Sequence, residues 1–328
     1  MLALFRNVVG LKAWRAWFES DFQFSLLTIN YLIWARRVNQ GFPPVRILIL
    51  VLSIGLYLAF GVLVNDYFDI DYDRRSGKKR TIYFVPRNIL HLLQTVLLAA
   101  SALLIVAISN PYYAILYGIS VVLAIAYSAP KPRFKEKGAL GLLVDVTIEK
   151  TFPTLLVLTF FNYFGLDAMV LVLLASCFHL EMIFRHQVED YQHDKDTGIK
   201  TLVSEKLGPE RAQHILDKYI RPPTAVLFLA FLLVLLTQSL HLLFIYLIMA
   251  AGYLLLKSKV AAAKVTLEDR FRPLYFAYVV VIDDNIIPVL LALLVLFYFP
   301  KYLFLVAITL LAQLERYRHF GLILRRAV

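Results

Sequence analysis

The sequence predicts an all-α polytopic membrane protein, a bundle of nine or ten transmembrane helices with a central cavity that opens near the cytoplasmic face. Three observations predict this class. Of the 328 residues, 60% are hydrophobic and only 17% are charged, and the mean hydropathy is +0.70, which is unlike a soluble domain. Long apolar stretches recur along the chain. The Lys and Arg residues gather in one set of the loops between these stretches.

Ten apolar stretches predict membrane crossings, because a helix needs roughly 20 apolar residues to span about 30 Å of hydrocarbon. In chain order they cover residues 22–35, 47–64, 89–108, 112–128, 139–161, 167–184, 223–239, 241–256, 274–299 and 302–314. The number is nine if the last stretch lies on the membrane surface. The longest polar interval precedes the seventh stretch, and its residues 209–220 predict an amphipathic helix.

The N-terminal residues 1–20 predict an interfacial helix that lies on the membrane surface. They combine Trp14, Trp17 and Phe18 with three basic residues, and they lack the compact apolar run and cleavage site of a signal peptide. Residues 21–328 contain no polar interval long enough for a soluble domain, so we expect one transmembrane domain. The chain has a single cysteine, which excludes an intramolecular disulfide.

The basic residues distinguish the two faces of the membrane. With ten crossings and the N-terminus inside, 29 of the 34 Lys and Arg residues lie on one face, and the positive-inside rule makes that face cytoplasmic. The net charge of +11 therefore predicts contact with a lipid bilayer and no nucleic-acid partner. We expect a multi-pass integral protein of the inner (plasma) membrane, with its active site toward the cytoplasm.

An acidic run closes the second apolar stretch. Asp66, Asp69 and Asp73 stand at i, i+3 and i+7 and share one helix face, whereas Asp71 points elsewhere. Stacked carboxylates repel one another unless a cation lies between them, and Mg²⁺ typically joins one or two carboxylates to substrate phosphates. The alternative is an ordinary solvated helix end. Asp is unfavourable there, however, because the macrodipole favours cations near a helix C-terminus.

A second acidic run closes the sixth apolar stretch. Gln187, Asp190 and Asp194 repeat the same spacing, and Gly198 offers a C-terminal stop. Two such stripes at one membrane face predict a divalent-cation site beside a polyanion such as a diphosphate. The basic residues that follow the stripes or lie between them are Lys78, Lys79, Arg80, Arg133, Lys135 and Lys200. The alternative for these residues is the positive-inside bias alone.

With these motifs the sequence resembles the UbiA superfamily of intramembrane prenyltransferases. The first family motif reads Asn-Asp-x-x-Asp-x-x-x-Asp and is matched by Asn65, Asp66, Asp69 and Asp73. Between the acidic runs, residues 127–135 match the family loop Tyr-Ser-x-Pro-x-x-Arg-x-Lys. The resemblance implies a single UbiA-like transmembrane prenyltransferase domain over residues 21–328.

The second family motif is matched less completely. It commonly reads Asp-x-x-Asp-x-x-x-Asp-x-x-x-Gly-x-Arg/Lys-Thr, and the matching residues here are Asp190, Asp194, Gly198, Lys200 and Thr201. Gln187 stands where many members carry the first Asp. A neutral amide adds no charge to a metal site, so this departure affects the second cation or the acceptor geometry.

The resemblance implies Mg²⁺-dependent transfer of an isoprenyl group from a prenyl diphosphate to an acceptor in the membrane, through ionisation to an allylic carbocation. It implies that the metal ligands are Asp66, Asp69, Asp73, Asp190 and Asp194, of which all but Asp73 are also assigned to catalysis. It implies that the diphosphate is bound by Arg133, Lys135, Lys79 and Lys200, with Asn65 and Tyr127 in support. The acceptor stays open among aromatic acids, quinol precursors, glycerol phosphate, sugars and tetrapyrroles.

Glu149 is a further catalytic candidate, from the fifth apolar stretch, which also contains Asp145 and Lys150. Ionisable residues inside membrane spans are costly and usually face the bundle interior. We therefore expect Glu149 to act as a cavity acid or base that takes a proton from the acceptor or the product.

Two other functions are compatible with parts of this pattern. A terpene cyclase of the same family would keep the acidic motifs, ionise the same diphosphate and need no separate acceptor. An ion-coupled transporter would also use intramembrane charges, but transporter sites usually lie near the bilayer midplane. The acidic stripes here close their helices at one face, which favours the transferase.

Overall fold

The structure is a computed structural model that describes residues 2–36, 42–75, 77–238 and 286–313, and every regular element in these ranges is helical. The α-helices are α1 (Leu2–Val9), α2 (Ser20–Ala35), α3 (Pro44–Arg75), α4 (Arg87–Ile108), α5 (Pro111–Ser128), α6 (Ala139–Val146), α7 (Phe152–Phe161), α8 (Leu166–Glu189), α9 (Tyr191–Thr197), α10 (Pro209–Ile215), α11 (Arg221–Gln238), α15 (Ile286–Tyr298) and α16 (Leu303–Ala312). Short 3₁₀ and π-helical segments are η1 (Lys12–Phe18), η2 (Thr81–Phe84), η3 (Phe134–Glu136), η4 (Thr147–Thr151), η5 (Val203–Leu207), η6 (Leu216–Ile220) and η8 (Pro300–Tyr302).

The helices follow the predicted apolar stretches closely. Among the described residues, five helices are long and apolar enough to cross a membrane: α3, α4, α5, α8 and the run Pro209–Leu235. The predicted crossing at 139–161 is formed by α6, η4 and α7 in direct succession. The predicted stretch 241–256 and the first part of 274–299 lie outside the described residues. The total of nine or ten crossings stays a prediction.

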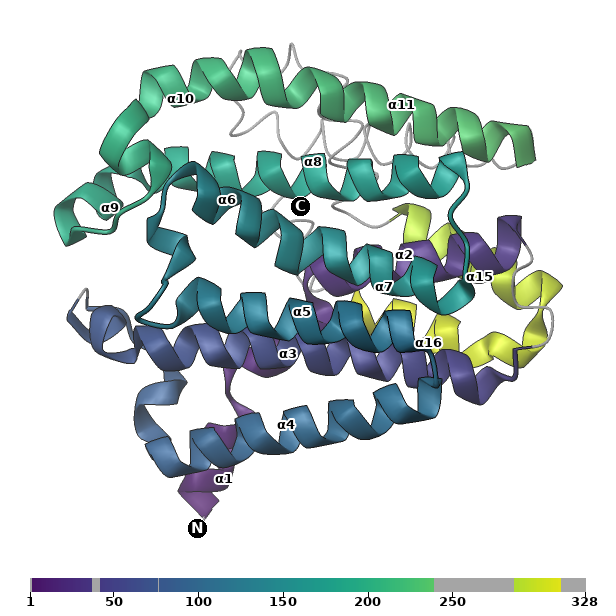
Figure 1. Cartoon of the computed structure of the whole chain (residues 1–328), viewed down its shortest axis with the longest axis horizontal. Coiled ribbons are helices and arrows are strands. Elements are labelled where there is room, and N and C mark those ends of the chain that lie inside the picture. The colour runs from purple at the N-terminus through teal and green to yellow at the C-terminus, as the bar shows by residue number, and fades with distance from the viewer. Residues whose placement is uncertain (1, 37–41, 76, 239–285, 314–328) are drawn as a thin grey trace, which may run out of the picture.

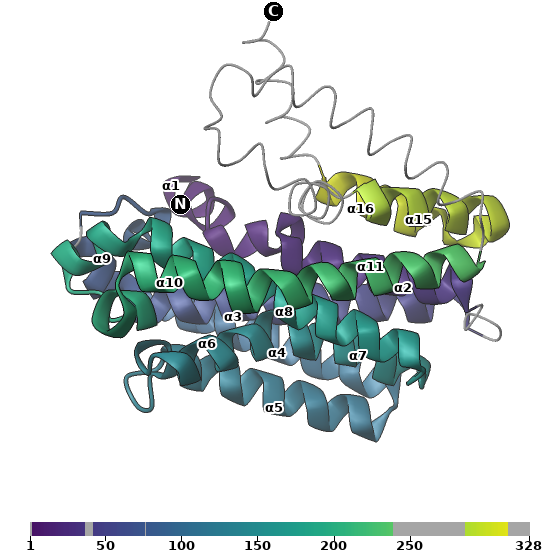
Figure 2. The same cartoon turned by 90° about the horizontal axis from the view of Figure 1, so that it is seen from above.

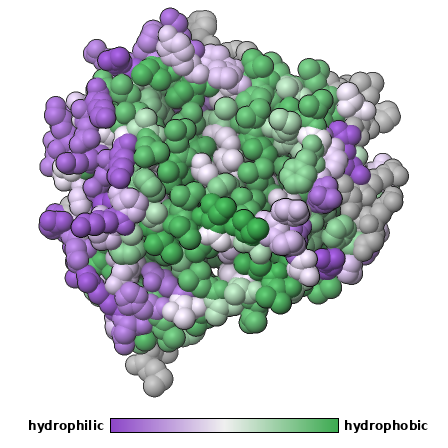
Figure 3. All heavy atoms as spheres, in the orientation of Figure 1, coloured by the Kyte–Doolittle hydropathy of each residue, from purple (hydrophilic) through white to green (hydrophobic). Residues whose placement is uncertain are grey.

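The long helices lie side by side, with α3 near the centre of the bundle (Figure 1). Helix α3 packs against α4, α5 and η1, while α8 packs against α11, and α15 against α2. Figure 2 shows α5 at one margin of the bundle and α15 and α16 at the opposite margin. Figure 3 shows a broad hydrophobic band with polar residues on either side of it, and one polar margin coincides with α9, the end of α3 and the loop between α5 and α6.

The N-terminal segment forms two elements instead of one helix. Helix α1 exposes Phe5 and Val9, whereas η1 enters the bundle, where its Ala13 and Ala16 are buried. Trp17 lies so close to α3 that a Cβ atom added at Gly55 would stand 2.2 Å from its ring. Only glycine leaves room for this contact. The interfacial placement of residues 1–20 therefore stays a prediction for α1, while η1 is part of the packed core.

Candidate active site

The first acidic stripe occupies the last turns of α3. Asp66 and Asp73 are each only 4% exposed, and Asp69 lies between them on the same face. Asp71 points away, since its side chain is 70% exposed and pairs with Arg87 at 2.8 Å. The prediction is confirmed that three carboxylates share one face of α3 and that the fourth, Asp71, lies outside it.

The chain that leaves α3 folds back over this stripe. The Arg80 guanidinium contacts two carboxylates: its Nη1 lies 3.0 Å from Asp66 Oδ1, and its Nε lies 2.8 Å from Asp73 Oδ2. Lys78 Nζ adds a contact of 3.4 Å to Asp73 Oδ1. Arg80 therefore holds the first and last carboxylates of the stripe together. The sequence placed Arg80 only among the general donors.

The loop between α5 and α6 supplies the cations for Asp69. Lys135 Nζ contacts Asp69 and lies 3.2 Å from Asn65 Oδ1, and Arg133 Nη2 lies 3.4 Å from Asp69 Oδ1. Ser128 Oγ donates to the same Asn65 oxygen at 2.9 Å. Asn65 thus anchors the loop to α3, and it positions Lys135 beside the stripe.

Burial and charge act in opposite directions on these two cations. Burial lowers the pKa of the Lys135 ammonium, and the neighbouring Asp69 opposes this only in part. Burial also acts to lower the pKa of Arg133, but its bonds to Glu136 and Asp69 outweigh burial and raise the pKa. Arg133 is therefore the more firmly charged of the two anion-binding candidates.

The second acidic stripe spans the junction of α8 and α9. Asp190 is the exposed residue between the two helices, and Asp194 is 5% exposed and accepts a bond from Thr201 Oγ1 at 3.4 Å. Gly198 ends α9 with a φ of 71°, a left-handed conformation that favours glycine, as predicted. Burial raises the pKa of Asp194, and the charge of Asp190 raises it further.

The second stripe has unsatisfied oxygen atoms. Across the described ranges, neither Asp190 nor Asp194 forms an ion pair with Lys or Arg, and the buried Oε1 of Gln187 has no hydrogen-bond partner. Crowded carboxylates and an orphaned amide oxygen suit a hard divalent cation, which prefers oxygen ligands. The residues present here therefore fit Mg²⁺.

The two stripes lie at the same end of the bundle (Figure 1). Tyr72, on α3, donates from its hydroxyl to the backbone oxygen of Thr197 on α9 at 3.2 Å. Lys78, which contacts Asp73, also acts electrostatically on Asp194. Residues more than 100 positions apart in the sequence are thereby brought to one site.

Two of the predicted diphosphate ligands lie beside this site. Lys79 is exposed, and Lys200, whose side chain is 63% exposed, pairs with Glu205 at 3.9 Å. Neither contacts the acidic stripes among the residues that the structure describes.

Tyr127 and Glu149 belong to a deeper polar cluster. Tyr127 interacts with Asp145 on α6, and Glu149, on η4, contacts His179 on α8. Tyr127 also lies within electrostatic range of Asp69, so the deeper cluster borders the acidic stripes. The charged residues inside the fifth apolar stretch indicated this cluster in the sequence. Nothing in the sequence linked that stretch to His179.

Comparison with known proteins identifies the family and the fold of the chain. A sequence profile of the UbiA prenyltransferase family matches residues 26–279, whereas no curated protein matches the chain. The structure is similar to that of a UbiA homolog from Archaeoglobus fulgidus bound to DMAPP and Mg²⁺, with 18% identity, a TM-score of 0.57, and coverage of 89% of this chain and 99% of the homolog. The same homolog bound to GPP and Mg²⁺ gives 19% identity, a TM-score of 0.56 and the same coverage. At these identities the likeness establishes the fold.

Proposed function

The chain belongs to the UbiA prenyltransferase family, and from this premise we propose that it transfers an isoprenyl group from a prenyl diphosphate to an acceptor within the membrane, with Mg²⁺ as cofactor. One observation carries the proposal. Two carboxylate stripes and three basic side chains, Arg80, Arg133 and Lys135, meet at one end of an apolar helical bundle. A prenyl diphosphate has the matching chemistry, because its head is polyanionic and its chain is apolar.

The metal would be held by Asp66, Asp69, Asp190 and Asp194, with Asp73 in support. When bound, Mg²⁺ would offset the negative charge that develops on the leaving diphosphate. The solved A. fulgidus homolog carries Mg²⁺ together with DMAPP or GPP, which supports the same pairing here. The unpaired carboxylates of the second stripe leave room for a cation without displacing Lys or Arg.

The basic side chains would bind and orient the diphosphate. Lys135 and Arg133 converge on Asp69, and Arg80 bridges Asp66 and Asp73. As cations take over these carboxylates, the Lys and Arg donors can turn toward the phosphate oxygens. Charge-assisted bonds to a leaving group stabilise the transition state most where water is excluded. The apolar core of the bundle would supply that environment.

The transferred group would be an allylic carbocation. The C–O bond to the diphosphate breaks, its electron pair leaves with the diphosphate, and a nucleophilic atom of the acceptor forms the new bond. The apolar interior shields the cation from water. In the membrane, the polar margin with the site faces the cytoplasm, α1 lies at the interface, and residues 21–328 form one domain.

The test is incubation of the purified full chain with Mg²⁺ and prenyl diphosphates of several lengths, with and without membrane extract, followed by mass spectrometry. Diphosphate release with a prenylated product that requires the extract supports transfer. An acceptor-free terpene would instead identify a cyclase. Absence of any turnover, together with unchanged diphosphate binding by Asp66→Ala and Asp190→Ala variants, would refute the metal and diphosphate assignment.

A further inference from the structure

A buried polar cluster lies deeper in the bundle than the acidic stripes. Its members come from three parts of the chain: Asp21 on α2, Asp145, Glu149 and Lys150 on α6 and η4, and His179 on α8. Such groups are costly inside a membrane protein and usually mark function. The cluster separates into a balanced ion pair and a second, unbalanced part.

The ion pair is formed by Lys150 and Asp21. The Lys150 side chain is 0% exposed, and its Nζ lies 2.9 Å from Asp21 Oδ1 and 3.1 Å from Ser20 Oγ. The ammonium also lies over the rings of Phe24 and Phe178. Its bonding capacity is thus taken up by neighbours, and the pair joins α2 to η4 as a structural contact.

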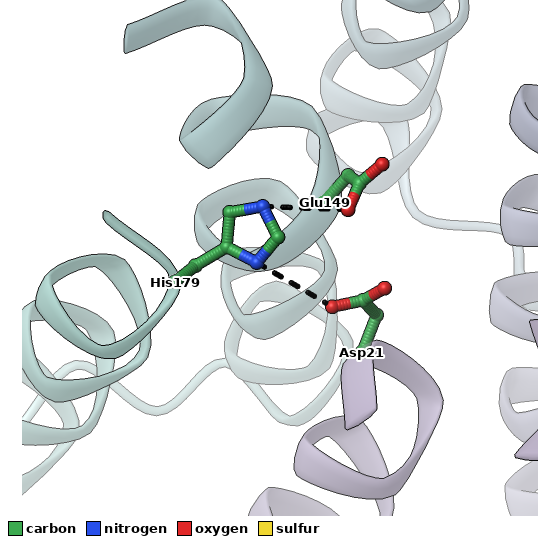
Figure 4. A group of neighbouring side chains, drawn as sticks. All are labelled: Asp21, Glu149 and His179. Carbon is green, nitrogen blue, oxygen red and sulfur yellow. Dashed lines mark ion pairs between the residues drawn. The ribbon is translucent and has the colours of Figure 1, made fainter. Parts of the chain in front are cut away.

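His179 is the centre of the unbalanced part. Its Nε2 lies 3.2 Å from Asp145 Oδ2 and 3.3 Å from Glu149 Oε2, whereas Nδ1 is 3.7 Å from Asp21 Oδ1 and has no hydrogen-bond partner (Figure 4). A metal ion bound to His179 Nε2 would lie near Glu149 and Asp145. Asp21 would lie on the other side of the imidazole ring, next to Nδ1. Asp21, Glu149 and His179 therefore suit a carboxylate–imidazole relay better than a shared ion.

Glu149 is the open member of the cluster. Its side chain is 40% exposed, whereas those of Asp21, Asp145, Lys150 and His179 are at most 16% exposed. Glu149 is therefore the most accessible acidic member of the cluster, while its imidazole partner is 1% exposed.

The cluster lies beside the helix that carries the first acidic stripe. Tyr57, on α3, donates to the backbone oxygen of Ile148 at 2.6 Å, which places η4 beside α3. Tyr57 precedes Asp66 by nine residues, or about 14 Å of helix rise. Lys12 lies within electrostatic range of both Asp66 and Glu149. These contacts place η4, and with it Glu149, beside the part of α3 that precedes the first stripe.

We propose that Glu149 is the proton-accepting contact of the acceptor subsite, and that this subsite takes a neutral, hydroxyl-bearing acceptor in preference to an anionic one. The inference rests on the proposed prenyl transfer and narrows its acceptor class. The cluster contains three acidic side chains and only two basic ones, Lys150 and His179. An acceptor carboxylate or phosphate beside Glu149 would be repelled, whereas a neutral hydroxyl would donate a hydrogen bond to it.

The acceptor's electron pair forms a bond to C1 of the prenyl group, and the C1–O pair leaves with the diphosphate. The proton that the acceptor loses passes to a Glu149 oxygen, and it can move on to the imidazole of His179. His179 is a positioning residue, because it touches Glu149 and not the acceptor.

The experiment measures binding by calorimetry, with the full purified chain, Mg²⁺ and a non-ionising geranyl thiolodiphosphate present throughout. Two probes of equal size are compared, neutral 4-hydroxybenzyl alcohol and anionic 4-hydroxybenzoate. We expect the neutral ring to bind at least roughly tenfold more tightly. Glu149→Gln should bring the two affinities close together, Glu149→Asp should keep the preference, and the exposed control Glu210→Gln should leave it unchanged.

His179→Asn should shift the ratio in the opposite direction, since removal of the imidazole leaves the carboxylates less compensated. Equal affinities for the two rings, a ratio that Glu149→Gln does not alter, or no saturable binding of either ring would overturn the inference. Unchanged binding of the thiolodiphosphate shows that each variant is folded. Failure of the unaltered chain to bind the thiolodiphosphate would instead overturn the proposed function, and the inference with it.

Discussion

The two acidic helix ends have the same spacing but different charge balance. On α3, Asp66, Asp69 and Asp73 each contact at least one Lys or Arg side chain. At the junction of α8 and α9, Asp190 and Asp194 have no such ion pair within the described part of the chain. The first end is therefore compensated by Lys and Arg, whereas the described residues supply no such partner to the second end, where we propose that a cation binds.

This difference indicates that the two acidic helix ends have different functions. The α3 end brings Lys135, Arg133 and Arg80 to the position that a diphosphate would occupy, and its carboxylates hold those donors in place. The second end keeps a buried carboxylate, Asp194, whose pKa is raised by burial and by Asp190. We expect Mg²⁺ to alter the second end most, because there it relieves the repulsion between Asp190 and Asp194 without competing with a paired Lys or Arg of the described chain.

The strongest test of the compensated end is removal of its central carboxylate. Asp69→Asn should lower kcat/KM for prenyl transfer roughly 10³-fold, since it removes a metal ligand and the partner of Lys135. The matched change Asp71→Asn, on the exposed side of the same helix, should leave activity within about twofold. Release of diphosphate under Mg²⁺ measures both. Equal losses in the two variants would contradict the assignment of one functional face.

Without metal, neutralising one carboxylate at each end should change the free energy of unfolding in opposite directions. Asp69→Asn should lower the free energy of unfolding by about 2 kcal/mol, because Lys135, which is 15% exposed, loses its carboxylate. Asp194→Asn should raise the free energy of unfolding by about 1 kcal/mol or less at neutral pH, because it removes an uncompensated buried charge. Unfolding in detergent with a chelator present measures both changes.

The pH dependence of unfolding tests the cause of the stabilisation that we expect from Asp194→Asn. The pKa of Asp194 is raised in the folded chain. The favourable contribution of this group to the free energy of unfolding is therefore complete below its unfolded pKa of about 3.9, and it is lost as the pH rises through the folded pKa. The advantage of Asp194→Asn should therefore appear at neutral pH and vanish in acid. An advantage of the same size at every pH would show that charge is not its cause.

Loss of the hydrogen bond between Tyr72 and Thr197, which links the two ends, should have a smaller effect. Tyr72→Phe removes the bond to the Thr197 oxygen and should lower stability by about 1 kcal/mol or less. It should also weaken Mg²⁺ binding a few-fold, because α9 is no longer tied to α3. Magnesium titration monitored by thermal shift tests this. An unchanged Mg²⁺ affinity would mean that the two ends bind metal independently.

The smallest expected effect concerns Gln187. Gln187→Asp adds a charge where the buried amide oxygen lacks a partner, so it should tighten Mg²⁺ binding by roughly threefold while lowering metal-free stability. The same magnesium titration, compared with the exposed control Gln192→Asp, separates the site effect from net charge. No gain in affinity would place Gln187 outside the metal shell.

By itself, the sequence determined the elements and the local faces. Apolar length predicted the helices, including the run 139–161, because crossing a bilayer demands a fixed number of apolar residues. The 3.6-residue period of a helix placed Asp66, Asp69 and Asp73 together and sent Asp71 away. Gly198 marked the end of α9 for an equally local reason, its left-handed backbone.

Only the tertiary structure decided which charges meet. It selected Arg80 over its neighbour Lys79 as the bridge between Asp66 and Asp73, and it brought His179 against Glu149 and Asp145. These contacts depend on how separate helices pack, and no periodicity within one helix encodes that packing. The sequence therefore determined both acidic stripes, whereas packing decided that, among the described residues, only the first is paired with Lys and Arg.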